Sequence, residues 1–150
     1  MRVFQVGADR FTELPGLPPQ KPASGFLWIG ATRAQFEAKL PELQALLQAW
    51  EGGPLVDLHV SDLLNTQLPS DYDYTSWYDL LVFRRLAAGS PREPVPADDR
   101  QAAVASARSA LAGIDTSPVG FALFDHVLIT VHPADCAVRS TRWCWCRSAI

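Results

Sequence analysis

Two apolar runs close to the C-terminal end give the clearest pattern in the chain. Residues 119–124 and 127–131 are each about as long as a strand, and β-branched and aromatic residues dominate both. The polar residues Asp125 and His126 separate them, and an aspartate suits a tight turn because its side chain can bond its own backbone. Pro118 precedes the first run and should lie outside the sheet, since a proline cannot donate to a ladder. The pattern predicts a β-hairpin at the centre of a sheet.

An amphipathic helix is predicted in the first third of the chain. Thr32 and Gln35 fit a capping box at its start, and Gly52 follows its end. Pro41 lies inside the pattern and should kink the helix or split it in two. The residues that recur at helical spacing form one apolar stripe, and they are Phe36, Leu40, Leu43, Leu47 and Trp50.

Several shorter segments complete the predicted sheet. Residues 1–6 and 26–29 predict strands, and residues 77–86 form a near-continuous apolar run that predicts a central strand covered on both faces. The polar residues 70–76 predict a loop. Residues 54–65 fit either a strand or a short helix, and periodicity alone does not decide between them.

The domain organisation is simple. We expect one α/β domain over residues 1–135, followed by an irregular tail over residues 136–150. Within the domain, residues 97–112 are rich in alanine, begin with acidic residues and are followed by Gly113, which predicts a peripheral helix.

Charge and composition narrow the functional classes. The net charge is −3, from 13 basic and 16 acidic residues, which argues against a nucleic-acid partner because phosphate binding needs a basic face. No apolar run approaches the roughly 18 residues of a membrane span, and the first residues lack the apolar core of a signal peptide. The three cysteines all lie in the last fifteen residues, and their odd number favours a reducing setting. We therefore expect a soluble, intracellular chain.

Three groups of residues carry candidate metal chemistry. Asp57 and His59 would point to one side of a strand, as two ligands of a metallohydrolase must, but they would diverge on a helix. A second group contains residue types that bind zinc, but Cys144 and Cys146 form a single C-x-C spacing, whereas a structural zinc site has two C-x₂₋₄-C pairs. That group consists of His132, Cys136, Cys144 and Cys146.

The third group is acidic. Residues 57–79 contain five aspartates and neither lysine nor arginine. Asp71 and Asp73 flank Tyr72 in the predicted loop, where carboxylate oxygens can gather a hard cation such as Mg²⁺ or Ca²⁺. We predict that Asp71 and Asp73 bind a divalent cation weakly, against the alternative of a solvated acidic rim. The phosphate-binding, nucleophile-elbow and zinc-protease motifs are all absent, so we expect a protein that is not an enzyme.

Taken in order, three blocks of this sequence resemble the cytoplasmic N-terminal domain of the CorA-type magnesium transporter family, which also includes zinc-transporting relatives. Residues 26–29, before the amphipathic helix, are similar to the family's W-I-D strand. Residues 58–65 resemble its I-H-P-L-x-L-E-D-x-L helix, which favours a helix for the ambiguous segment. Residues 78–84 and the later hairpin resemble its Y-D-x-L-x-x-x-L-R strand and the hairpin that ends in x-V-T-V-H.

The resemblance implies an α+β fold of three layers (α/β/α), in which a mixed β-sheet is sandwiched between helices. Family members are homopentamers that conduct divalent cations, and their cytoplasmic domains carry regulatory cation sites and lead into a stalk and two membrane helices. We therefore expect the regulatory domain of a CorA-like divalent metal ion transporter, at the cytoplasmic face of the inner membrane. Its expected partners are copies of itself and divalent cations.

The sequence also departs from the family pattern. It has no G-M-N motif and no membrane span, so we expect the chain to end before the stalk and the pore. Residues 87–90 read Ala-Ala-Gly-Ser where the family can carry a cation-sensing acid. A stand-alone soluble interaction module with the same fold is the first alternative, and a metal-dependent hydrolase is a more distant one.

Overall fold

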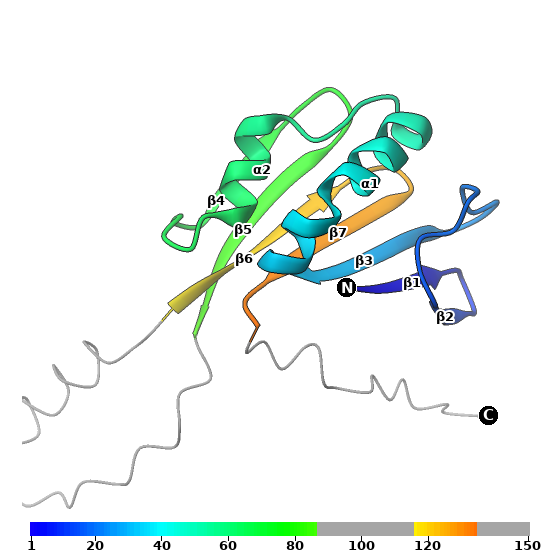
Figure 1. The fold of residues 1–150 in the computed structure, drawn as a ribbon, viewed down its shortest axis with the longest axis horizontal. Coiled ribbons are helices and arrows are strands. Elements are labelled where there is room, and N and C mark those ends of the chain that lie inside the picture. Colours follow the sequence, from blue (N-terminus) through cyan, green and yellow to red (C-terminus); the bar gives the residue numbers. More distant parts are fainter. Residues whose placement is uncertain (87–115, 135–150) are drawn as a thin grey trace, which may run out of the picture.

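The computed structural model describes residues 1–86 and 116–134 of the chain. In this part of the chain seven strands form one mixed sheet in the order β2-β1-β3-β7-β6-β5-β4, with two helices packed against it (Figure 1). The strands are β1 Arg2–Val6, β2 Phe11–Leu14, β3 Phe26–Thr32, β4 Asp71–Tyr74, β5 Asp79–Leu86, β6 Thr116–Leu123 and β7 Val127–His132. The helices are α1 Arg33–Glu51 and α2 Asp57–Leu64.

The predicted hairpin is confirmed as the middle of the sheet. Strands β6 and β7 pair antiparallel, and β7 continues the sheet by pairing parallel with β3. Pro118, however, lies inside β6 rather than outside it. The proline is tolerated because β7 pairs with β6 only from Gly120 onward. At Pro118, β6 therefore pairs with β5 on one side and makes no strand pairing on the side of β7.

Helix α1 begins as its sequence predicts. The Thr32 hydroxyl accepts a hydrogen bond from the Gln35 amide, and the Gln35 side chain accepts one from the Thr32 amide. Gly52 ends the helix in the left-handed conformation, at φ 83°. The helix is not split at Pro41, because this residue is exposed while Phe36 on one side of it and Leu43 on the other are anchored in the core.

The segment over residues 54–65, which the sequence left open between strand and helix, contains the helix α2. This helix packs on β6 through Leu63, which lies against Gly120, a residue of β6 without a side chain. A Cβ atom at Gly120 would lie 2.3 Å from the Leu63 Cδ2 atom. The short helix can therefore approach the sheet closely, and this contact fixes the position of its buried face.

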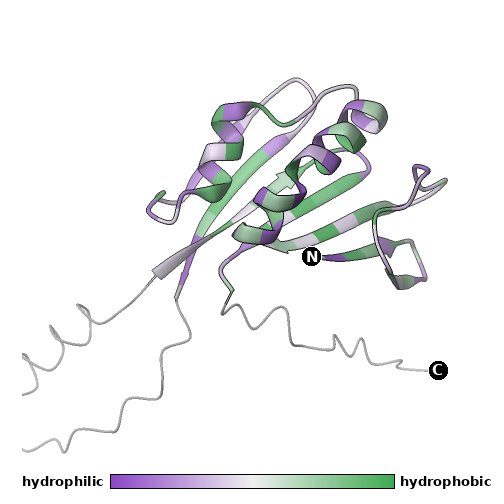
Figure 2. Cartoon of the chain, in the orientation of Figure 1, coloured by the Kyte–Doolittle hydropathy of each residue, from purple (hydrophilic) through white to green (hydrophobic). Residues whose placement is uncertain are grey.

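The core lies between the helices and one face of the sheet, as the hydrophobic colouring of the central strands in Figure 2 illustrates. Alternate residues of the central strands face α1 and α2 and are buried. The largest fully buried side chains of this core include Leu27, Ile29, Ile129, Phe36, Leu43, Leu47 and Leu63. Fully burying one such side chain contributes roughly 1.5–3 kcal/mol.

The prediction of a strand covered on both faces is wrong for the part of β5 that is described. Leu80 and Val82 are buried under the helices, but Phe83 on the opposite face is 53% exposed. Both described helices cover the same face, and the predicted helix over residues 97–112 lies outside the described residues, as does the predicted tail over residues 136–150. Within residues 1–86 and 116–134, no helix is both long enough and apolar enough to cross a membrane.

Candidate functional site

Residues 70–76 were predicted to form a loop, and this is wrong. Asp71–Tyr74 form the edge strand β4, which pairs antiparallel with β5. Its alternation of aspartate and tyrosine has the period of a strand, and an exposed edge tolerates polar side chains. Asp71 and Asp73 therefore project from one side of β4, and both are exposed.

Asp73 belongs to a chain of hydrogen bonds that runs into the protein. The buried His59 of α2 lies between Asp73 and Tyr78, with its Nε2 atom 3.0 Å from Asp73 Oδ2 and its Nδ1 atom 2.6 Å from the Tyr78 hydroxyl. The amide of Val56 donates to the same hydroxyl at 3.0 Å. His59 can donate its Nε2–H group to Asp73, while its Nδ1 atom shares a hydrogen bond with the Tyr78 hydroxyl.

The pKa values of Asp73 and Tyr78, at the two ends of this series of hydrogen bonds, are both shifted. The hydrogen bond from His59 lowers the pKa of the Asp73 carboxyl, and the amide of Tyr74, which donates to Oδ1 at 2.7 Å, acts in the same direction. Burial raises the pKa of the Tyr78 phenol. Asp73 is thus held as a carboxylate, and each of its oxygens already accepts a hydrogen bond from the protein.

The predicted magnesium ligands do not form a complete site by themselves. Within the described residues, Asp71 and Asp73 belong to no group of three metal-ligating side chains. Weak binding of a divalent cation at Asp71 and Asp73 stays a prediction, and its ligand shell would consist largely of water.

The other predicted metal ligands also separate in the structure. Asp57 is exposed in the first turn of α2 whereas His59 is buried, so the pair diverges as expected on a helix and does not form the hydrolase arrangement. His132 is buried at the end of β7, with Nδ1 3.0 Å from the Pro133 carbonyl oxygen. The cysteines proposed to join His132 lie outside the described residues.

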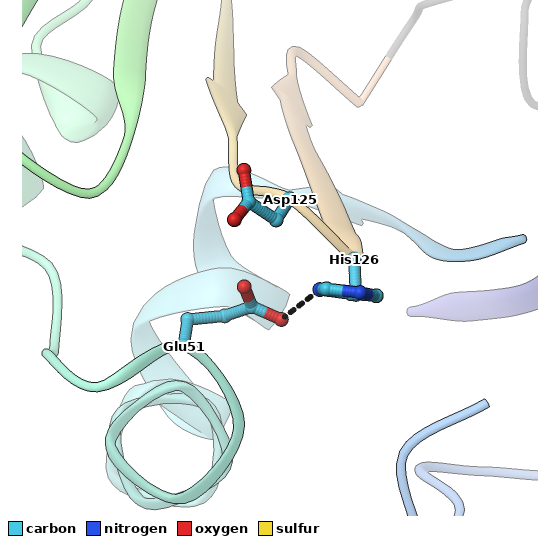
Figure 3. A group of neighbouring side chains, drawn as sticks. All are labelled: Glu51, Asp125 and His126. Carbon is cyan, nitrogen blue, oxygen red and sulfur yellow. Dashed lines mark ion pairs between the residues drawn. The ribbon is translucent and has the colours of Figure 1, made fainter. Parts of the chain in front are cut away.

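A second group of ligands, which the sequence did not predict, lies between the end of α1 and the β6–β7 turn (Figure 3). It consists of Glu51, the last residue of α1, and of Asp125 and His126 in the turn. One ligand atom from each residue lies within 4.8 Å of the others. The turn is held by hydrogen bonds from the Phe124 amide to the Val127 carbonyl and from the Leu27 amide to the His126 carbonyl, each 2.8 Å long.

The environment of Glu51 is unusual for a carboxylate. Its side chain is only 4% exposed, and its Oε1 atom accepts no hydrogen bond. His126 Nδ1 lies 3.5 Å from that oxygen, is itself buried and has no hydrogen-bond partner either. The Lys21 ammonium lies 3.6 Å from Oε1 and donates to the Trp50 carbonyl at 2.8 Å.

An open hollow of about 450 Å³ borders this group. Glu51 and Asp125 form part of its wall, together with side chains from the segment that leads into β5. Its lining residues are Glu51, Thr75, Ser76, Trp77, Tyr78, Asp79, Leu123 and Asp125. Glu51 and Asp125 therefore belong both to this group and to the wall of the hollow.

The sequence marks only two of the three residues of this group as unusual. Asp125 and His126 stand out as the polar interruption between two apolar runs, but Glu51 looks like any charged residue at the end of a helix. The three meet because β7 pairs in parallel with β3, the strand that leads into α1. That pairing cannot be derived from local patterns.

The described residues form a mixed α+β domain in which two helices pack against one mixed sheet. Comparison with protein-family models and with curated protein sequences gave no match. Among solved structures, the chain is similar to the cytoplasmic domain of ZntB, a CorA-family transporter, from Vibrio parahaemolyticus RIMD 2210633, with a TM-score of 0.54 and 12% sequence identity.

The similarity covers 95% of this chain and 47% of the ZntB chain, so the chain spans about half the length of the solved structure that it matches. At this sequence identity the comparison establishes the fold. It confirms the predicted mixed sheet with its packed helices and the predicted likeness to the CorA cytoplasmic domain.

Proposed function

We propose that this chain is the cytoplasmic, regulatory domain of a CorA-like divalent metal ion transporter and is not an enzyme. The observation that carries the proposal is the structural match to the ZntB cytoplasmic domain over 95% of the chain. In this chain the β6–β7 hairpin lies in the middle of the sheet, and the two helices pack on one face of it. The separation of Asp57 from His59 removes the arrangement on which a hydrolase activity was considered.

In this role the domain lies at the cytoplasmic face of the inner membrane and reaches the membrane only through a pore region that is not in this sequence. Its partners are copies of itself, assembled as a homopentamer when joined to the pore, and divalent cations. Exposed carboxylates such as Asp71 and Asp73 offer such cations weak, largely hydrated contacts.

The proposal is tested by extending the reading frame and measuring transport. The native gene is sequenced through and beyond the codons for the predicted tail over residues 136–150, and the protein from the native frame is reconstituted into vesicles that contain a fluorescent indicator for Zn²⁺ or Mg²⁺. We expect two further apolar spans, cation influx above that of protein-free vesicles, and influx that changes when residues 1–134 are deleted.

A frame that ends at Ile150, with no membrane span, would contradict the transporter role and support the stand-alone interaction module. Influx that is present but unaffected by deletion of residues 1–134 would contradict the regulatory role alone.

A further inference from the structure

We propose that Glu51, Asp125 and His126 form a binding site for a transition-metal ion of the zinc type, which ties the end of α1 to the β6–β7 turn. The site is distinct from the exposed pair Asp71 and Asp73. Because metal binding is a property of this chain alone, the inference does not depend on the transporter role.

The first observation is the pair of buried polar atoms that face each other without a hydrogen bond. Glu51 Oε1 and His126 Nδ1 are 3.5 Å apart, and neither has a hydrogen-bond partner. The Glu51 side chain is 4% exposed, and its Oε1 atom is buried. A buried polar group that lacks a partner costs stability, and a cation between the two atoms would satisfy both.

The second observation is the spacing. Zinc bonds to nitrogen and oxygen are about 2.0–2.1 Å long, and a tetrahedral angle then separates two ligand atoms by about 3.4 Å. The 3.5 Å between Glu51 Oε1 and His126 Nδ1 already matches that separation. Asp125 immediately precedes His126, and one of its carboxylate oxygens lies within 4.8 Å of a ligand atom of each of the other two residues (Figure 3). The Asp125 side chain is exposed, and a bound ion would draw it closer.

The ligand set and the surroundings both favour a zinc-type cation. One imidazole and two carboxylates suit zinc and its neighbours, whereas magnesium prefers oxygen ligands and retains its water. Glu51 also stands at the C-terminal end of α1, where the helix dipole favours positive charge and where the last turn carries no basic residue of its own. Three protein ligands leave a fourth position for water, which can enter from the adjoining hollow.

The charge of Lys21 should affect the metal affinity of the site. Its ammonium lies 3.6 Å from Glu51 Oε1 and therefore competes with a bound cation for the same oxygen. Removing that charge should strengthen metal binding, whereas removing a ligand should weaken it. A purely structural role of the cluster would not produce these opposite effects.

The experiment is a calorimetric titration with zinc chloride alone. Cys136, Cys144 and Cys146 can bind zinc through their thiolates, so the reference protein is the full 150-residue chain with all three changed to serine. We expect one bound ion per chain. His126→Gln should weaken the affinity at least about tenfold, which is what even an indirect partner of a metal ligand typically contributes.

Matched variants complete the test. Glu51→Gln should weaken the affinity as much as His126→Gln, while Glu37→Gln, an exposed glutamate of the same helix, should leave it unchanged. Lys21→Gln should raise the affinity, and magnesium chloride should give no comparable binding. His126→Gln is the principal variant because the His126 side chain is 39% exposed, so its replacement leaves the core in place.

The proposal is overturned if the reference protein does not bind zinc, if His126→Gln binds as tightly as the reference, or if Lys21→Gln does not bind more tightly. These results leave the transporter role untouched, because that role is tested by the reading frame and by ion flux.

Discussion

At the scale of single residues, Asp73 shows how hydrogen bonds make stability depend on pH. The hydrogen bond from His59, assisted by the Tyr74 amide, lowers the pKa of Asp73 below its ordinary value of 3.8. The ionised carboxylate therefore stabilises the folded chain above that ordinary value, and the contribution is lost as the pH falls through the lower, folded pKa.

We expect Asp73→Asn to melt at a lower temperature than the wild type at neutral pH, with the difference in Tm closing as the solution is acidified below about pH 3.8. Thermal melts across this range measure the effect, and Asp9→Asn, in an exposed turn, serves as the control. A Tm difference between wild type and Asp73→Asn that stays constant over the whole range would contradict the assignment.

Asp71 and Asp73 also carry the prediction of weak magnesium binding. Because exposed carboxylates without a third ligand bind Mg²⁺ mainly through water, we expect Mg²⁺ to raise Tm only at concentrations on the order of millimolar. The double variant Asp71→Asn/Asp73→Asn should lose this increase, and Glu51→Gln should keep it. A large increase at micromolar Mg²⁺ would show a much tighter site than the structure supports.

The residues that could be predicted from sequence are those whose partners are close in the chain. Thr32 and Gln35 are three positions apart, and their capping box forms as expected. Glu51 and His126 are far apart in sequence, so their meeting depends on strand order and could not be read from local patterns. The role of Asp73 was missed for the same reason, since His59 reaches it from another element.

At the scale of secondary-structure elements, the start of α1 depends on its cap. The Thr32 side chain accepts a hydrogen bond of 3.3 Å from the Gln35 amide. Thr32→Ala removes it and should lower the free energy of unfolding by about 1 kcal/mol, which urea denaturation followed by circular dichroism can measure. Thr66→Ala, at an exposed position after α2, should change it by less than about 0.5 kcal/mol. Equal effects of the two variants would argue against the cap.

The contact between α2 and β6 makes a second prediction for an element. A methyl group at Gly120 would overlap Leu63, which is buried at 2% exposure and has little room to move. Gly120→Ala should therefore lower the free energy of unfolding by about 1–3 kcal/mol. Gly16→Ala is the matched control, because nothing lies within 4 Å of its added Cβ atom. If Gly120→Ala proved as stable as that control, α2 could not lie where the structure has it.

Elements with a strong local pattern were predictable, and elements that depend on a neighbour were not. The apolar stripe of α1 and the two runs of the β6–β7 hairpin were sufficient to predict both. Strand β4 was missed because its exposed Asp and Tyr residues resemble a polar loop, and only pairing with β5 makes the segment a strand. Pro41 was expected to kink or split α1, but the helix continues through it because the proline is exposed and core contacts anchor the helix on either side.

At the scale of the whole molecule, the strand order sets the fold, which is similar to that of the ZntB cytoplasmic domain. Strand β7 connects two halves of the sheet, since it pairs parallel with β3 on one side and antiparallel with β6 on the other. Sequence order alone would place consecutive strands side by side, and this crossover pairing is what brings Glu51 to the β6–β7 turn. The fold and the proposed metal site therefore rest on the same arrangement.

Cross-strand nuclear Overhauser effects between backbone protons of the isotope-labelled chain test this arrangement most directly. The strand order predicts a parallel pattern that joins Ile29 to Ile129 and an antiparallel pattern that joins Val82 to Gly120. Helical contacts within Phe26–Thr32, or contacts from Val127–His132 to strands other than β3 and β6, would contradict both the strand order and the similarity of fold to the ZntB cytoplasmic domain.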